Sequence, residues 1–106
     1  MTLTHYGFIV LAKGYQPKIQ RSVMENEHFK TQVIGVSSVE DAVTVANDLI
    51  KEGVQVIELC GGFGEDNANK VINSLDSQTP IGFVGFSVSE TQKLSKLLKL
   101  TFKLND

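Results

Sequence analysis

The sequence has little that would cross-link the chain, anchor it or give it a strong charge. Cys60 is the only cysteine among 106 residues, so no disulfide can form within the chain, and we expect a cytoplasmic location. The apolar run near the N-terminus, residues 8–12, is too short for a membrane span or a secretory signal. The formal net charge of −2 gives no general attraction to nucleic acid or anionic lipid, so we expect neither as a partner.

Metal sites and phosphate-binding loops also lack their usual motifs. One cysteine and two histidines far apart in the chain, His5 and His28, do not form a ligand cluster, so we expect no metal site. The chain has no GxxxxGK[ST] motif, and its nearest approach to GxGxxG has Asn67 where the third glycine belongs. The sequence therefore identifies no cofactor.

What is present fits one globular domain spanning residues 1–106. Hydrophobic residues make up 42% of the chain and charged residues 21%, as in typical globular proteins. We find no internal repeat, low-complexity tract or linker that would divide the chain. Its length suits a single modest core.

Four apolar, β-rich segments predict strands, and the segments between them predict helices. The strands are expected over residues 5–12, 31–36, 54–60 and 81–86. Helices are expected from Pro17 through Met24, behind a capping box at Ser37 and Glu40, after the glycines at 61–64, and behind a capping box at Ser87 and Glu90. Residues 98–104 alternate, so we expect the last helix to give way to a short extended end, with a C-terminal edge strand as the alternative.

Strands that alternate with helices predict right-handed crossovers and a parallel sheet. We therefore expect a single α/β domain of three layers, with a mainly parallel four-stranded sheet in the flavodoxin-like order 2-1-3-4. Segment 5–12 is apolar enough to be buried on both faces of that sheet. Ligands of such folds bind beyond the carboxyl ends of the strands, where the loops at 13–15 and 60–64 would meet.

The glycine turn at 60–64 is the leading candidate for a ligand site. Glycine permits close approach to the backbone, and successive amides followed by a helix N-terminus can form a concave nest for an anion. Lysine and arginine nearby would supply positive charge. The ligand-binding candidates are Gly61, Gly62, Phe63, Gly64, Arg21 and Lys13.

The alternative is that the glycines form a plain structural turn. Glu65 and Asp66 would fall at the start of the following helix, where they would offset its positive end and repel a phosphate. One of these two residues, or Asn67, is expected to cap that helix. The sequence leaves the ligand site and the plain turn about equally supported.

Cys60 and Glu58 are the candidate catalytic residues. Cys60 would end a strand beside amides that could stabilise a thiolate, but a small buried hydrophobe is the simpler interpretation. His5 would lie at the opposite edge of the sheet, roughly 20 Å away at about 3.3 Å per residue, so it cannot be the base for Cys60 within one chain. Glu58 is either a general base or a group that orients the ligand. The simpler interpretation is a rim carboxylate bonded to loop amides or to Lys13 or Arg21.

Charge separates along the chain. Residues 40–66 carry seven acidic side chains and one lysine, whereas Lys93, Lys96, Lys99 and Lys103 form a basic stripe opposite the leucines of the last helix. Most such stripes are solvated faces. Acidic and basic faces could also meet in a homo-oligomer, and Leu97, Leu98 and Phe102 would then form an interface.

Three stretches carry a resemblance: GFIVLAKGYQP followed by an arginine, VIGV, and ELCGGFG. With them, residues 6–86 resemble an uncharacterised family of small bacterial proteins, a domain of unknown function with an ELCGGFG signature. In that family a histidine often precedes the arginine, where this chain has Gln20 before Arg21. The resemblance implies a shared fold and a shared loop, in which Glu58, Cys60 and the glycines act as one unit, and it implies no reaction.

The leading hypothesis from the sequence is a small polar or anionic metabolite bound at the glycine turn. One alternative is an oligomeric structural or regulatory module without a ligand. Another is an enzyme that uses Cys60 or Glu58. The residue pattern names neither a substrate nor a reaction.

Overall fold

The computed structural model describes the backbone of residues 2–105 and the side chains of residues 2–99. The strands are β1 (His5–Leu11), β2 (Arg21–Glu25), β3 (Lys30–Val36), β4 (Val56–Leu59) and β5 (Ile81–Phe83). The helices are α1 (Val39–Lys51), α2 (Gly64–Asn73) and α3 (Val88–Asn105), and a 3-10 turn, η1 (Gly61–Phe63), precedes α2. Within the described chain, none of the helices is both long enough and apolar enough to cross a membrane.

The five strands form one sheet in the order β2-β3-β1-β4-β5. All neighbouring pairs are parallel except β2 and β3, which are antiparallel. The expected strand count of four, and with it the expected order of the whole sheet, is therefore wrong, because β2 adds a strand at the outer edge of β3. The four strands predicted from the sequence are β3, β1, β4 and β5, which are neighbours in that order.

β2 occupies the segment for which the sequence predicted a short helix after Pro17. Asn26 favours a hairpin over the predicted helix, because its side-chain Oδ1 accepts hydrogen bonds from the amides of His28 and Phe29, at 2.8 and 2.9 Å. Such an Asx turn reverses the chain into a hairpin. Residues 21–25 then pair with β3 instead of coiling.

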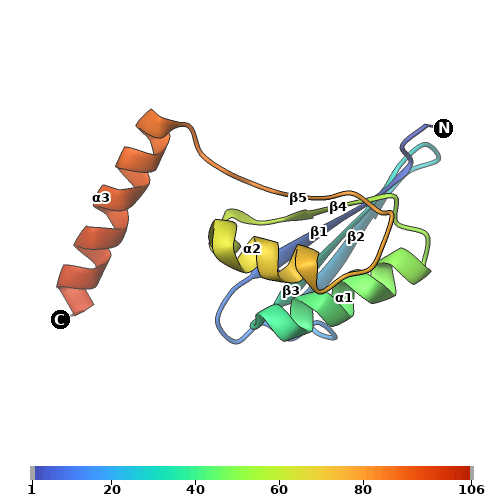
Figure 1. Ribbon diagram of the computed structural model, residues 1–106, viewed down its shortest axis with the longest axis horizontal. Coiled ribbons are helices and arrows are strands. Elements are labelled where there is room, and N and C mark those ends of the chain that lie inside the picture. The colour runs from blue at the N-terminus through green and yellow to red at the C-terminus, as the bar shows by residue number, and fades with distance from the viewer. Residues whose placement is uncertain (1, 106) are drawn as a thin grey trace.

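The domain has two layers, not the three that the sequence predicted. α1 and α2 pack against each other on one face of the sheet, and Figure 1 shows both helices on that side. Their inward side chains join the sheet in one core, which includes Ile9, Leu49, Ile57, Leu59 and Val71. The second helical layer is missing because the segment that should supply it became β2.

The opposite face of the sheet, which we call the open face, carries no helix within the described chain. Side chains alternate along a strand, so the neighbours of Ile9, Ile34 and Ile57 point to this side. The open face comprises Tyr6, Phe8, Val10, Val33, Val56 and Glu58, all of which are half-buried. A loop at residues 15–20 covers only its corner, where the Tyr15 ring lies over Gly35.

α3 stands apart from the rest of the domain. It follows β5 through an extended segment at residues 84–87 and lies beyond the sheet, which gives the molecule a long axis of 47 Å against 29 and 28 Å (Figure 1). The helix continues to Asn105, so the expected extended end and the alternative edge strand are wrong. Leucines and lysines alternate there on a helical period as well, which made the segment ambiguous. The side chains of Phe102 and Lys103 lie outside the described residues.

Helix boundaries follow local chemistry. Ser38, one residue after the expected Ser37, caps α1, because its Oγ accepts a hydrogen bond from Asp41 N at 3.1 Å. Gly53 takes φ +97° just after α1, as predicted for a glycine that ends a helix. α2 has no side-chain cap, contrary to expectation, because its first residue Gly64 follows directly on η1.

Candidate functional site

The larger of two cavities described here lies between α1 and the edge strand β2. It has a volume of about 670 Å³, within the range of small-molecule sites. Ile34 of β3 and the inner face of α1, Val45 and Leu49, contribute its apolar surface. Gln16, Pro17 and Lys18 of the loop before β2, with Arg21, form the facing wall.

Charges of opposite sign face each other across this cavity. Lys51 and Glu52, at the end of α1, also line the cavity and offset each other in charge. Lys18 and Arg21 contribute positive charge from the loop and β2, while α1 presents Asp41 and Asp48 with Thr44 between them. The three residues of α1 are spaced i, i+3 and i+7, so they share one side of the helix. No ion pair among the described side chains joins the two walls. The opposed charges therefore remain available to a ligand.

A buried amide network supports one end of the cavity. Gln32, which is only 5% exposed, donates from Nε2 to Glu52 Oε2 at 3.2 Å, and Glu52 lines the cavity. The same nitrogen lies 3.0 Å from His5 Nε2. Gln32 thereby links the start of β1 to Glu52, the residue that caps the end of α1.

The glycine turn has a different geometry, in which the backbone packs closely against the end of β1. A Cβ placed on Gly62 would lie 3.1 Å from the Leu11 carbonyl oxygen and 3.3 Å from Cys60 Sγ. Gly64 has φ +68° and ψ 169°, a region essentially limited to glycine. Close packing at Gly62 and the backbone conformation at Gly64 thus explain two of the three glycines without a ligand.

Only part of the predicted amide nest is available. Phe63 N donates to Cys60 O at 3.1 Å, and Gly64 N donates to Gly61 O, so the turn itself uses both hydrogens. The amides of Gly61 and Gly62 have no protein acceptor within the described residues. Phe63 is buried in the core beneath the turn. Neither of the two cavities described here includes a residue of the turn.

The structure separates the residues that the sequence grouped into one site. Lys13 follows β1 and so lies at the same carboxyl edge as the glycine turn after β4. Arg21 lies on β2, three strands from β4, which corresponds to about 14 Å at about 4.8 Å per strand. Arg21 instead lines the large cavity and also a second one of about 290 Å³ on the open face, beside Tyr15 and Gln20.

Glu58 lies on the open face rather than in a cavity. Tyr6, on the neighbouring strand and the same face, lies close enough for the charge and hydrogen bonding of this carboxylate to act on its phenol. Partial burial raises the pKa of the Tyr6 phenol, and the charge of Glu58 and this hydrogen bonding raise it further. Glu58 thus pairs with a tyrosine, and no ion pair with Lys13 or Arg21 is present among the described residues.

Cys60 is half-buried at the end of β4, where its Sγ accepts a hydrogen bond from Leu11 N at 3.2 Å. His5 begins β1 and His28 lies in the β2–β3 hairpin, so both histidines are at the amino ends of the parallel strands. Cys60 is at the carboxyl end and has no histidine beside it. Within the described residues, no three histidine, cysteine or acidic side chains cluster closely enough to hold a metal ion.

Sequence reasoning missed most of the cavity, because three separate segments build it. The sequence analysis did not single out Lys18 or Thr44, and it counted Asp41 and Asp48 only among the acidic residues of 40–66. The signal that could have identified them is the polar row on α1, which borders the apolar stripe on the side of the basic loop. Only Arg21 was identified in advance.

Comparison of the chain with curated proteins gave no match, and comparison with solved structures gave none. A family model matches residues 4–99, which run from just before β1 into α3. That family is described only as one of unknown function, so the match fixes a relationship and no activity. The chain belongs to the family of unknown function DUF6506.

Proposed function

We propose that the protein binds a small polar metabolite that carries an anionic group, in the cavity between β2 and α1. The observation that carries the proposal is the pair of oppositely charged walls over an apolar floor, with no ion pair joining them among the described side chains. Ion-pairing groups that face an opening of this size are suited to a ligand with complementary charge.

The walls assign a role to each end of the ligand. Arg21 can grip a carboxylate or phosphate with two parallel hydrogen bonds, and Lys18 adds a second positive charge. Asp41 and Asp48 would accept hydrogen bonds from an amine or hydroxyl groups at the other end. Ile34 and Leu49 would contact the carbon skeleton between them.

The glycine turn is the second candidate for the same ligand class. Its support is the two amides of Gly61 and Gly62, which point to no protein acceptor in the described chain, together with Lys13 at the same edge. If the protein is an enzyme that uses Cys60 or Glu58, its reaction would take place near this turn.

The single cysteine fits a reducing compartment, and we propose a cytoplasmic location on that ground.

A ligand screen on matched variants tests the proposal. Carboxylated, phosphorylated and zwitterionic metabolites are added to the wild type, and thermal unfolding is followed. A ligand present at 100 times its dissociation constant stabilises the protein by about 2.7 kcal/mol. We expect Arg21→Gln and Asp48→Asn to abolish this stabilisation, and Lys70→Gln, on exposed α2 away from the cavity, to retain it.

Gly61→Ala separates the two candidate places. A Cβ at Gly61 meets nothing closer than 3.8 Å, so the variant should fold while its methyl group covers the turn. If Gly61→Ala abolishes binding and Arg21→Gln does not, the ligand binds at the glycine turn. If no compound in any class shifts the unfolding temperature, metabolite binding is wrong.

A further inference from the structure

The open face and α3 are two apolar surfaces of the same chain that do not cover each other. Phe8, Val10 and Val56 remain half-buried on the sheet, and α3 exposes 60% of Leu97 and 58% of Leu98. In the described chain, α3 forms no extended packing contact with the sheet or with the other helices. Helices in proteins are stabilised mainly by packing an amphipathic face, so α3 needs a surface.

We propose that two copies of this chain exchange their α3 helices, each α3 lying across the open face of the other copy. The exchange is symmetric, so one dimer forms the same helix–sheet contact twice. It would also supply the third layer that a parallel sheet of this type normally has. The inference is independent of the proposed metabolite site, which lies on the other face.

The dimensions of the two surfaces match. An 18-residue helix is about 27 Å long at about 1.5 Å per residue. The seven residues of β1 extend about 23 Å at about 3.3 Å per residue. α3 can therefore cover the open face along its whole length.

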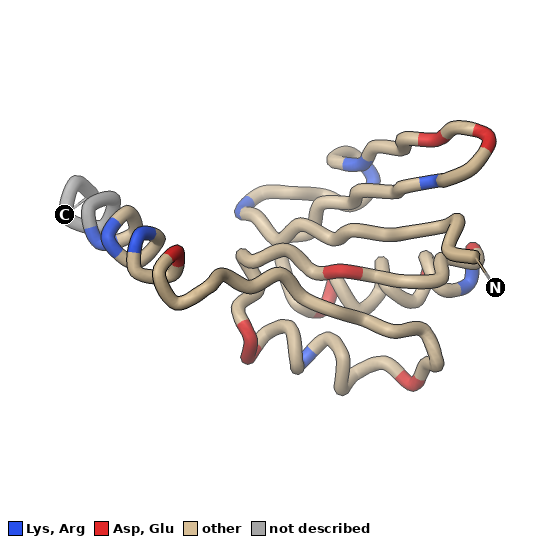
Figure 2. The backbone as a smooth tube through the Cα atoms, turned by 90° about the horizontal axis from the view of Figure 1, so that it is seen from above, with Lys and Arg blue, Asp and Glu red and all other residues tan. Residues whose placement is uncertain are grey.

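Charge favours the same pairing. Residues 1–87 carry ten acidic and six basic side chains, whereas residues 88–106 carry four basic and two acidic ones. Figure 2 shows mainly basic positions on the coloured part of α3, and both acidic and basic positions over the sheet and the other two helices. The lysines lie opposite the leucines of α3, so the opposite net charges would favour the approach of the two copies, while the leucines would make the contact with the open face.

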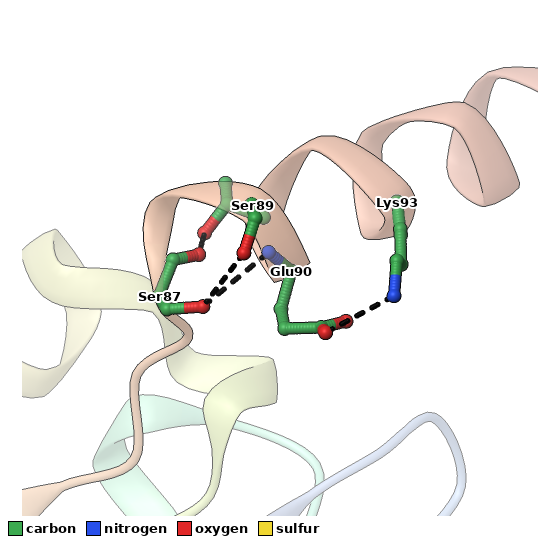
Figure 3. A network of polar contacts seen from close by, with 5 residues as sticks. Ser87, Ser89, Glu90 and Lys93 are labelled. Atoms are coloured by element: carbon green, nitrogen blue, oxygen red, sulfur yellow. Dashed lines mark hydrogen bonds and ion pairs between the residues drawn. The ribbon is translucent and has the colours of Figure 1, made fainter.

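The connecting arm favours a second copy over the chain's own sheet. Val84 N still donates to Leu59 O at 2.9 Å, so the arm leaves the sheet in the direction of its strands. The first turn of α3 is then fixed by Ser87, whose Oγ accepts from Glu90 N at 3.4 Å and whose carbonyl accepts from Thr91 Oγ1 at 2.8 Å. Figure 3 shows this turn, with Lys93 Nζ 3.1 Å from Glu90 Oε1.

Only three residues, 84–86, remain between the end of the sheet and that capped turn. Folding back onto the chain's own open face would require a sharp reversal within them, and the structure has them extended (Figure 1). An extended arm that delivers its helix to another copy is the usual geometry of a domain swap. Phe86, 54% exposed on the arm, would be covered at the crossing point of the two arms.

The test measures molecular mass in solution by sedimentation and light scattering. We expect the full chain to have twice its mass of 11.6 kDa. Val56→Lys places a charge on the open face and Leu98→Lys places one on α3, and each should raise the dimer dissociation constant roughly tenfold or more. Val23→Lys, at an exposed position on the edge strand β2, is the matched control and should leave the dimer intact.

Mixing the two disruptive variants tests the exchange itself. A Val56→Lys copy keeps a normal α3, and a Leu98→Lys copy keeps a normal open face, so the mixture can form one of the two contacts and should give heterodimers. Where Val56→Lys fails to fold by circular dichroism, Gly82→Lys replaces it, because a Cβ at Gly82 meets nothing within 4 Å. A monomeric wild type, dimeric single variants or a mixture that stays monomeric would each overturn the proposal.

Discussion

The two faces of the sheet are built from the same strands, yet only one of them is filled by the chain itself. On the face covered by α1 and α2, Ile9, Ile57 and Leu59 are fully buried. On the open face, their strand neighbours Phe8 and Val56 are apolar as well but remain half-buried. Apolar residues on both sides of a strand therefore predict that both faces of the sheet are covered. Which face the chain covers with its own helices depends on the topology.

The largest expected contrast is between side chains on the two faces of β4. Leu59→Ala removes a side chain with no exposed surface and leaves a cavity in the core, so it should lower the free energy of unfolding by about 3 kcal/mol. Val56→Ala, on the open face, should lower it by about 1 kcal/mol or less. Urea unfolding of both variants measures the difference.

Protein concentration sharpens that contrast. If α3 of a second copy covers the open face, the loss from Val56→Ala should grow as the protein is concentrated, because only the dimer buries Val56 fully. The loss from Leu59→Ala should not change. Equal losses for the two variants under all conditions would mean that the faces do not differ as described.

Two glycines provide the next contrast, with smaller effects. Gly7 points toward the helices, and a Cβ there would lie 3.0 Å from Leu49 Cδ1 in the packed core. Gly7→Ala should therefore destabilise the protein by about 1 kcal/mol or more. Gly82 is paired with Glu58 on the open side and has free space around it in one chain, so Gly82→Ala should stabilise by about 0.5 kcal/mol at concentrations where the protein is monomeric.

Thermal unfolding of Gly7→Ala and Gly82→Ala gives the sign of each effect directly. Stabilisation of both variants would show that Leu49 moves aside easily and that the covered face is loosely packed. Destabilisation of both would show that the space beside Gly82 is filled in solution by something bulky. A helix from another copy would be the first candidate.

The sequence was sufficient for those parts of the fold that depend on one segment at a time. The apolar runs at 5–12, 31–36, 54–60 and 81–86 marked the parallel strands, and the spacing on α1 and α2 marked the covering helices. The prediction of a helix around Val23 was wrong because the few apolar residues there fit the spacing of a helix and that of a strand equally well. The hydrogen bonds of Asn26 in the hairpin favour the strand. Missing that strand also produced the wrong number of layers.

The candidate site was harder to predict for the same reason. The sequence indicated the glycine turn because three glycines in four positions stand out, but Gly62 and Gly64 have backbone explanations in packing and φ. The larger cavity depends on where the loop at 16–18 passes α1, which no local pattern encodes. Arg21 was recognised only as a nearby charge, because its strand was not predicted.

The smallest expected effect concerns the one polar pair on the open face. Folding raises the pKa of the Tyr6 phenol, chiefly through partial burial, with Glu58 adding its charge and its hydrogen bond. The folded state therefore holds this proton more tightly than the unfolded state. The stability that results is present in full below pH values near 10, the ordinary pKa of tyrosine, and is lost as the pH rises through the raised pKa of the folded protein.

Tyr6→Phe tests this pair while keeping the ring on the sheet. The variant should be less stable than the wild type by about 0.5 kcal/mol or less near neutral pH, because it lacks the hydroxyl that interacts with Glu58 at a partly solvated site. That difference should shrink as the pH rises above about 10 and through the raised pKa of the folded phenol, which then ionises beside the carboxylate. Urea unfolding at several pH values gives both quantities, and Tyr15→Phe, with no such carboxylate partner, is the control. If the stability difference between the two proteins stays constant across this pH range, Glu58 does not interact with the phenol. The open face is then more solvated than its half-buried side chains imply.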